Sequence, residues 1–188
     1  MSRCSGRKTD LFIGHLERYV FSLLYVKKKR VLDAGAKDGY GSHLLSCFAD
    51  HVTLADRDEV HLEIARRSYK FLCPTDFKII DFDVGFPAGT WDVIIAFEVI
   101  EHVADPDFFV RNIAEHLSEG GRLVFSVPHM IVNDDHKTLF DEEGIKKLVS
   151  KYLKLEEFYV QDKTGISGLP ATSPPKSYVG VASKKHES

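Results

Sequence analysis

The sequence has few cysteines and no long apolar run, and each shortage excludes a class of protein. Its 188 residues include only three cysteines, Cys4, Cys47 and Cys73, with no CxxC pair among them. An odd, scattered set cannot all pair within one chain, so we expect a reducing compartment. No run approaches the roughly 18 apolar residues of a membrane helix, and the first residues lack a signal peptide's apolar core. We therefore expect a cytoplasmic protein without a membrane partner.

A large excess of charge is also missing. The formal net charge of −3 argues against a protein that coats nucleic acid without sequence preference. One dense basic run, Lys27–Arg30, precedes an apolar segment, and we interpret it as a solvated helix end rather than a phosphate-binding patch. The 44% hydrophobic content suffices for one buried core. Neither an internal repeat nor a long linker is visible, although residues 165–175 read as a Gly/Ser/Pro loop.

Apolar β-branched runs alternate with amphipathic stretches along the chain, which is typical of an α/β protein with helices on both faces of its sheet. We expect seven strands in a mostly parallel sheet, the last two forming an antiparallel hairpin. The expected strands are 30–33, 51–55, 77–80, 91–97, 123–127, 155–161 and 178–182. The expected helices are 11–26, 40–48, one that Asp58 caps, 108–117 (stopped by Gly120 and Gly121) and 142–152.

The segment VLDAGAKDG places a carboxylate, Asp33, at the end of the first expected strand, followed by glycines that lead into a helix. Glycines let the backbone approach a ligand closely, and a helix N-terminus attracts anions such as a pyrophosphate or an amino-acid carboxylate. Asp33 would repel a pyrophosphate but suits an ammonium group. The dinucleotide pattern GxGxxG also fails, because Lys37 follows Gly35 and Leu44 follows Gly39 where glycines are required. Both points disfavour a dehydrogenase.

The same segment resembles the first motif of class I methyltransferases that use S-adenosylmethionine (SAM), usually written DxGxGxG, with Lys37 in place of the middle glycine. Among these enzymes the chain is similar to the type 11 and type 23 groups. The resemblance implies a Rossmann-like α/β fold in a single domain. We divide it into an N-terminal helix (1–28), a cofactor-binding core (29–128), and a substrate-side loop with the terminal hairpin (129–188).

The resemblance also implies which residues bind SAM. Asp56 matches the acid that accepts both ribose hydroxyls, and Arg57 can line the adenine. Asp83 matches the acid that meets the adenine amino group, with Asp81 as a weaker choice. The full expected cofactor set is Asp33, Gly35, Ala36, Gly39, Asp56, Arg57 and Asp83.

A second group of polar residues follows the fourth expected strand. Glu98, Glu101 and His102 stand at i, i+3 and i+4, so one helical turn would set them on one face, where they can hold Mg²⁺ or Mn²⁺. The string EVIEH with a later DHKxxF resembles ubiquinone-pathway O-methyltransferases and small-RNA 3′-terminal 2′-O-methyltransferases. In the latter, two Glu and two His bind the ion, which implies Glu98, Glu101, His102 and His136 here. Alternatively, His102 is the general base without a metal, and His129 is a second candidate base.

Together these patterns predict an enzyme that methylates an oxygen of a hydroxylated small molecule or sugar, with SAM and with Mg²⁺ or Mn²⁺ as cofactors. An adjacent cation would lower the pKa of the attacking hydroxyl and hold a vicinal diol. RNA is a less favoured acceptor, because the charge and length leave no room for an extended RNA-binding domain. A non-catalytic SAM-binding partner subunit is the remaining alternative. We expect a monomer or a homodimer.

Overall fold

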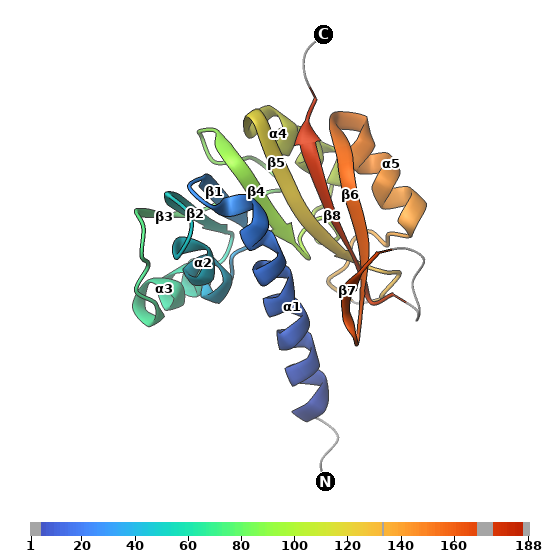
Figure 1. Cartoon of the computed structure of the whole chain (residues 1–188), viewed down its shortest axis with the longest axis horizontal. Coiled ribbons are helices and arrows are strands. Elements are labelled where there is room, and N and C mark those ends of the chain that lie inside the picture. Colours follow the sequence, from blue (N-terminus) through green and yellow to red (C-terminus); the bar gives the residue numbers. More distant parts are fainter. Residues whose placement is uncertain (1–4, 133, 169–174, 186–188) are drawn as a thin grey trace.

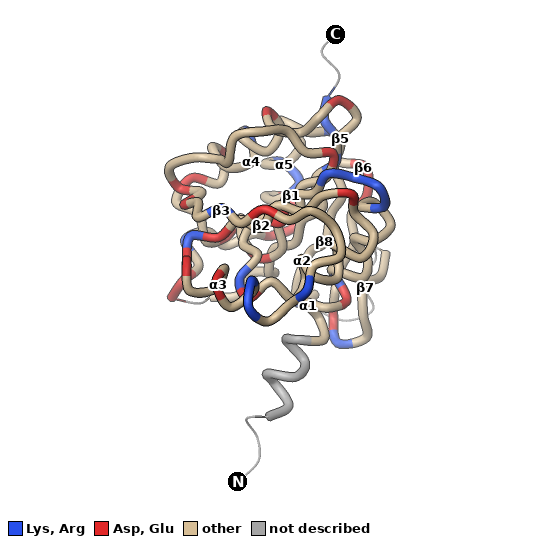
Figure 2. Tube along the Cα trace, turned by 90° about the vertical axis from the view of Figure 1, so that its left-hand side faces the viewer, with Lys and Arg blue, Asp and Glu red and all other residues tan. Residues whose placement is uncertain are grey.

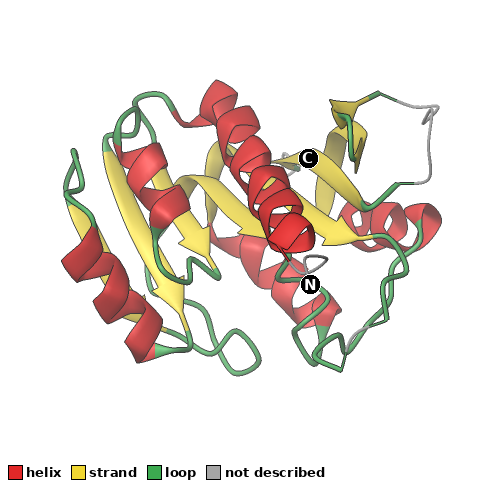
Figure 3. Cartoon of the chain, turned by 90° about the horizontal axis from the view of Figure 1, so that it is seen from below, coloured by secondary structure: helices red, strands yellow, loops and turns green. Residues whose placement is uncertain are grey.

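A computed structural model of the chain describes residues 5–132, 134–168 and 175–185, with the side chains of the first helix described from residue 13 onward. The fold is one mixed sheet with helices on both faces (Figure 1, Figure 3). Its strands are β1 (Arg30–Ala34), β2 (His51–Asp56), β3 (Thr75–Ile79), β4 (Trp91–Phe97), β5 (Leu117–Pro128), β6 (Leu153–Asp162), β7 (Gly165–Ser167) and β8 (Ser177–Lys184). Its helices are α1 (Ser5–Val26), α2 (Tyr40–Ser46), α3 (Glu59–Ser68), α4 (Pro106–His116) and α5 (Glu142–Tyr152).

The strand order is β3-β2-β1-β4-β5-β8-β6-β7. The strands β1 to β5 pair in parallel, whereas β8 is antiparallel to both of its neighbours, β5 and β6. The predicted α/β class and the antiparallel pairing of the last two long strands are confirmed. Among the described residues, no helix is long and apolar enough to cross a membrane.

Strand β4 shows why the central strands are apolar on both sides. Its Val93, Ile95 and Phe97 belong to the core beneath α1, α2 and α3, whereas Ile94 and Ala96 belong to the core beneath α4 and α5. Successive side chains of a strand point to opposite faces, and here both faces are covered. A strand in this position therefore reads as a continuous apolar run.

Aspartates begin three of the helices. Asp58 accepts a hydrogen bond from the backbone N–H of Val60 at 2.8 Å, which confirms the expected cap of α3. Asp105 and Asp141 cap α4 and α5 in the same way. Each such cap stabilises its helix by about 1 kcal/mol.

Two predicted boundaries are wrong. Gly120 and Gly121 do not stop α4, because the helix ends at His116 and Leu117 already pairs with Trp91 as the first residue of β5. The short strand β7 lies at the start of the predicted loop 165–175, which gives the sheet eight strands instead of seven. Residues 169–174 of that loop lie outside the described residues.

The partner of the last strand is also different. We expected residues 178–182 to pair only with the strand before them in the sequence, yet β8 lies between β5 and β6 and bonds to both. Alternation alone cannot predict this insertion, because β8 has no alternating pattern and is buried from Ser177 to Ala182. Its first residue, Ser177, pairs with Pro128 at the carboxyl end of β5.

The strand order reverses direction between β1 and β4. From β1 the chain continues outward to β2 and β3, whereas β4 is followed on its other side by β5. Loops that leave such neighbours diverge, and ligands of open α/β sheets bind in the resulting crevice at the carboxyl ends of the strands. Helix α1 lies across this part of the sheet, with its N-terminal end projecting beyond the strands (Figure 1).

Candidate functional site

A cavity of about 280 Å³ opens at this crevice. It is lined by residues of the turn after β1, the end of β2, the segment after β3 and the turn after β4. Four of the seven residues expected to bind SAM line it: Gly35, Asp56, Arg57 and Asp83. Lys37, Glu98 and His102 line the same cavity. Residues from both predicted groups thus meet at one edge of the sheet.

Glycines shape the turn after β1 because a side chain has no room there. Gly35 has φ 73°, and a Cβ at this position would lie 2.6 Å from Cγ2 of Val99. Gly39 has φ 76°, and its Cβ would lie 2.5 Å from that of Ala65 in α3. Lys37 also has a left-handed backbone, φ 46°, with an exposed side chain. The lysine therefore adopts the backbone conformation that the resembled motif gives to glycine.

Asp56 ties the end of β2 to this turn. Its Oδ2 accepts a hydrogen bond from the backbone N–H of Lys37 at 2.9 Å, and its Oδ1 accepts one from Asp58 at 3.0 Å. The residue is only 8% exposed although it lines the cavity. The backbone thus fixes a carboxylate at the cavity wall, as binding of a ribose diol requires.

Asp33 does not line the cavity. It is fully buried behind the turn, where it accepts hydrogen bonds from the hydroxyls of Tyr19 at 3.1 Å and Ser42 at 2.5 Å. Burial raises the pKa of Asp33 to about 7. Its direct role is to fasten α1 and α2 to β1, and contact with a SAM ammonium stays a prediction. Ala36 and Gly39 likewise lie outside the cavity lining.

Asp83 connects three segments at the cavity rim. Its Oδ1 accepts a hydrogen bond from the backbone N–H of Ala104 at 2.6 Å, and its Oδ2 accepts one from Nζ of Lys137 at 2.6 Å. The Lys137 hydrogen bond lowers the pKa of Asp83. Asp81 accepts from the backbone N–H of Asp83 at 3.0 Å and also lines the cavity.

Glu101, His102 and His136 form a compact group beside the cavity. One ligand atom from each lies within 4.8 Å of the others. The loop after β5 brings His136 there, because the backbone N–H groups of Lys137 and Thr138 donate to the carbonyl of Glu101 at 2.8 and 3.2 Å. Three of the four residues expected to bind a metal are therefore brought together.

Each of the two imidazoles is held by a backbone carbonyl at its Nδ1. Nδ1 of His102 lies 2.9 Å from the carbonyl oxygen of Asp135, and Nδ1 of His136 lies 2.8 Å from that of Ile131. A carbonyl only accepts, so each Nδ1 carries the hydrogen and each Nε2 keeps a free lone pair. This arrangement is the usual support of a metal-binding histidine.

Glu101 is the most unusual member of the group. It is fully buried, and both of its carboxylate oxygens lack a hydrogen-bond partner among the described residues. Burial, followed by repulsion from Glu98, raises the pKa of Glu101 to about 8. A buried carboxyl without a partner is costly. A cation between Glu101 and the two imidazoles would supply the missing partner, so the donor set fits a divalent ion.

Glu98 stands apart from this group. The residues after β4 form a turn instead of the expected helical turn, and Glu98 itself has φ 55°. Its carboxylate pairs with the guanidinium of Arg18 and accepts a hydrogen bond from Oγ of Ser126 at 2.9 Å. The expectation that one helical face would carry Glu98 with Glu101 and His102 is therefore wrong, because the chain reverses at this point.

The other candidate base, His129, is in contact with a phenol. Its Nδ1 lies 2.8 Å from the hydroxyl of Tyr178, and it does not line the cavity. The sequence analysis missed two residues near the edge, Arg18 and His15 of α1. Burial, helped by Arg18, lowers the pKa of His15 to about 4. Polar residues on the otherwise buried face of a helix are the signal that could have identified Arg18.

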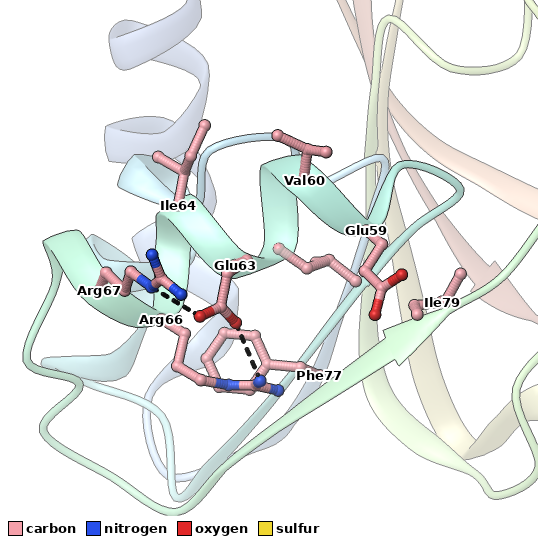
Figure 4. Close-up of a pocket in the computed structure, with 9 residues that line it drawn as sticks. Glu59, Val60, Glu63, Ile64, Arg66, Arg67, Phe77 and Ile79 are labelled. Carbon is pink, nitrogen blue, oxygen red and sulfur yellow. Dashed lines mark hydrogen bonds and ion pairs between the residues drawn. The ribbon is translucent and has the colours of Figure 1, made fainter.

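A second cavity of about 450 Å³ lies on the outer side of α3 and β3 (Figure 4). Three of its charged side chains are already paired, since Glu63 binds Arg66 at 3.2 Å and Arg67 at 2.7 Å. The guanidinium of Arg66 also lies 4.6 Å from the ring centre of Phe77. No expected site residue lines this cavity, and we assign the candidate active site to the crevice at the carboxyl ends of the strands.

Comparison with known proteins agrees with this geometry. The family described as "Methyltransferase domain" matches residues 15–152. A "Probable S-adenosylmethionine-dependent methyltransferase" of Mycobacterium tuberculosis is 35% identical over 101 residues, which cover 54% of this chain and 36% of that protein. A "Ubiquinone biosynthesis O-methyltransferase" of Coxiella burnetii is 30% identical over 116 residues, covering 58% of this chain and 47% of that protein. The match thus spans less than half of each relative.

Solved structures share the fold at low sequence identity. The N-methyltransferase NodS from Bradyrhizobium japonicum, in complex with S-adenosyl-L-homocysteine, has a TM-score of 0.76 at 16% identity, covering 94% of this chain and 88% of that one. TehB from Haemophilus influenzae has a TM-score of 0.71 at 19% identity, covering 89% and 61%. The family match covers most of this chain, and the solved structures share its fold. The chain therefore belongs to the SAM-dependent methyltransferases of class I fold.

Proposed function

We propose that the protein transfers a methyl group from SAM to an oxygen of a small acceptor that carries two adjacent hydroxyls, assisted by a divalent cation. The buried carboxyl of Glu101, whose oxygens accept no hydrogen bond among the described residues, lies beside His102 and His136 and carries the proposal. Oxygen as the acceptor atom is supported by the similarity to a protein named as an O-methyltransferase of ubiquinone biosynthesis.

The ligand set favours Mn²⁺ over Mg²⁺. Mg²⁺ prefers oxygen ligands, whereas two imidazoles with one carboxylate suit transition metals. With Glu98 engaged by Arg18, the group formed by described residues contains one carboxylate, that of Glu101. When bound, the cation would lower the pKa of a coordinated hydroxyl and so make it a better nucleophile.

The chain's own residues hold the two reactants at one edge. SAM, when bound, supplies a methyl group that is electrophilic because it is carried on a sulfonium. Asp56 offers a fixed carboxylate for the ribose, and Gly35, where Val99 leaves no room for a side chain, lines the cavity with its backbone. His102 lines the same cavity and presents Nε2, so it can hold the cation or accept the hydroxyl proton. Alignment of the two reactants is the main contribution that such a site makes.

The size and charge of the site favour a small acceptor over RNA. The cavity of about 280 Å³ must admit both SAM and the acceptor, and the chain has a formal net charge of −3. A polynucleotide would need a groove of basic side chains around the opening. Asp56, Asp81 and Asp83 line the cavity instead.

The proposal is tested by methyl transfer from labelled SAM to a panel of catechols, sugars and short RNA ends, with and without a chelator. We expect transfer to diols that stops in chelator and returns with Mn²⁺. A matched panel of acceptors with one of the two hydroxyls already methylated should be inactive. Full turnover in chelator would remove the cation from the mechanism and leave His102 as the candidate base.

A further inference from the structure

The outer face of α1 carries a stripe of exposed apolar side chains. Ile13, Leu16, Val20 and Leu24 are 56%, 37%, 53% and 75% exposed. Their spacing of three, four and four residues places them on one side of the helix. The opposite side packs against the sheet through Arg18, Tyr19, Ser22 and Val26. An amphipathic helix normally turns polar residues to water, so this second apolar face needs a different environment.

Positive charge continues the stripe. Lys27 follows Leu24 by three residues, and all four members of the run Lys27–Arg30 are exposed. Figure 2 shows how Lys and Arg are distributed along the chain. The first 30 residues contain eight Lys or Arg and two Asp or Glu, whereas the whole chain has a net charge of −3. The molecule therefore has a strongly basic first helix and turn on an acidic body.

We infer that this face of α1, with the Lys27–Arg30 run beside it, is a peripheral docking surface for an anionic lipid bilayer. A helix with an apolar face and adjacent basic residues lies in the plane of the membrane interface, with its apolar side chains at the acyl boundary. Basic residues at the surface bind anionic headgroups. The apolar stripe would insert at the acyl boundary, and the basic run would bind the anionic headgroups.

A second copy of the chain fits this face less well. The run Lys27–Arg30 follows the end of the helix. Parallel pairing of two α1 helices would therefore bring two basic runs together. Four apolar side chains also form a patch well below the roughly 1,200 Å² that a stable interface buries. An anionic surface neutralises the basic run instead.

The surface adjoins the candidate active site through Arg18. Arg18 lies on the buried side of α1 and pairs with Glu98, which lines the cavity. Docking would thus place the helix that covers the site on the lipid, within reach of an acceptor held in the bilayer. The inference itself does not rest on methyl transfer. The sequence alone led us to expect no membrane partner, because the exposure of the stripe depends on which side of α1 is buried.

The test is flotation of the purified protein with vesicles. We expect it to float with vesicles that contain phosphatidylglycerol and to stay behind with pure phosphatidylcholine. Val20→Ser with Leu24→Ser should abolish flotation. Lys27→Glu with Lys29→Glu should weaken binding by at least about fivefold per lysine, and binding of the unaltered protein should fall with added salt.

Matched controls separate this surface from general stickiness. Leu72→Ser removes an exposed leucine elsewhere, and Lys147→Glu with Lys154→Glu reverses two exposed lysines of α5 and β6. Both controls should float as the unaltered protein does, and all variants should keep their melting temperature and SAM affinity. Failure to float with anionic vesicles overturns the inference. Sedimentation showing a dimer that Val20→Ser with Leu24→Ser dissociates, without vesicle binding, assigns the face to a second copy instead.

Discussion

Arg18 of α1 and Glu98 at the end of β4 form an ion pair 80 residues apart in sequence, with side chains only 4% and 17% exposed. The same guanidinium donates to Oγ of Ser126 at the end of β5, at 2.7 Å. One arginine thus joins the first helix to the ends of two parallel strands. It also engages the carboxylate of Glu98, which is not a member of the candidate metal group of Glu101, His102 and His136.

Arg18→Met should destabilise the protein by about 2–4 kcal/mol, because it leaves the carboxylate of Glu98 without its partner in a largely dry place. Urea unfolding followed by circular dichroism measures the change. The double variant Arg18→Met with Glu98→Gln removes both charges and should recover much of the loss. A double variant as unstable as the two single variants combined would mean that the pair is not coupled.

Asp56→Ala should weaken SAM binding by about 1.5–3 kcal/mol, because the charge-assisted hydrogen bonds to the ribose are lost. Titration calorimetry with S-adenosylhomocysteine gives the affinity. Asp58→Ala is the matched control: it removes the cap of α3 and about 1 kcal/mol of stability while leaving the affinity unchanged. Equal affinities for Asp56→Ala and the unaltered protein would exclude Asp56 from the cofactor site.

Asp33→Asn should change how stability depends on pH. Burial raises the pKa of Asp33 to about 7 in the folded protein, above its ordinary value of 3.8. The folded state therefore holds a proton that the unfolded state releases, and this contribution to stability is lost as the pH rises from about 4 to about 7. The asparagine variant has no carboxyl group at this position, so its stability does not fall for this reason as the pH rises. It should gain up to about 4 kcal/mol over the unaltered protein at alkaline pH and nothing near pH 4. If the free energies of unfolding of the two proteins changed with pH in the same way over this range, Asp33 would be ionised throughout.

Lys37→Gly should stabilise the fold by about 1 kcal/mol, since a side chain at φ 46° is strained where glycine is not. Thermal unfolding is the measurement. Lys147→Gly within α5 is the matched control, and it should destabilise by a similar amount because glycine weakens a helix interior. If Lys37→Gly lowers the melting temperature, the lysine side chain makes a contribution that outweighs its backbone strain.

His136→Ala and Glu101→Gln should each reduce Mn²⁺ affinity by at least about tenfold, as loss of a ligand does, while SAM affinity changes little. Binding of Mn²⁺ to the protein alone, measured by electron paramagnetic resonance, separates this result from any effect on turnover. His129→Ala should bind Mn²⁺ normally, because His129 contacts Tyr178 away from the group. Unchanged Mn²⁺ binding in both ligand variants would mean that the ion lies elsewhere.

The sequence by itself determined the local features of this protein. The apolar run of β4 and the aspartate cap at Asp58 each follow from propensity or capping rules that act within a few residues. The order of acids along the chain likewise predicted which edge of the sheet carries the candidate site, because parallel strands end on the same side of a sheet.

Only the tertiary structure decided which of these residues meet. The insertion of β8 beside β5, the pairing of Arg18 with Glu98 and the binding of the 134–138 segment to Glu101 are contacts between distant segments. Helical spacing predicted a shared face for Glu98 and Glu101, but a reversal of the backbone after β4 turned them apart. Contacts of this kind depend on the free energy of packing whole helices and strands against one another. Rules that consider only neighbouring residues do not include this free energy.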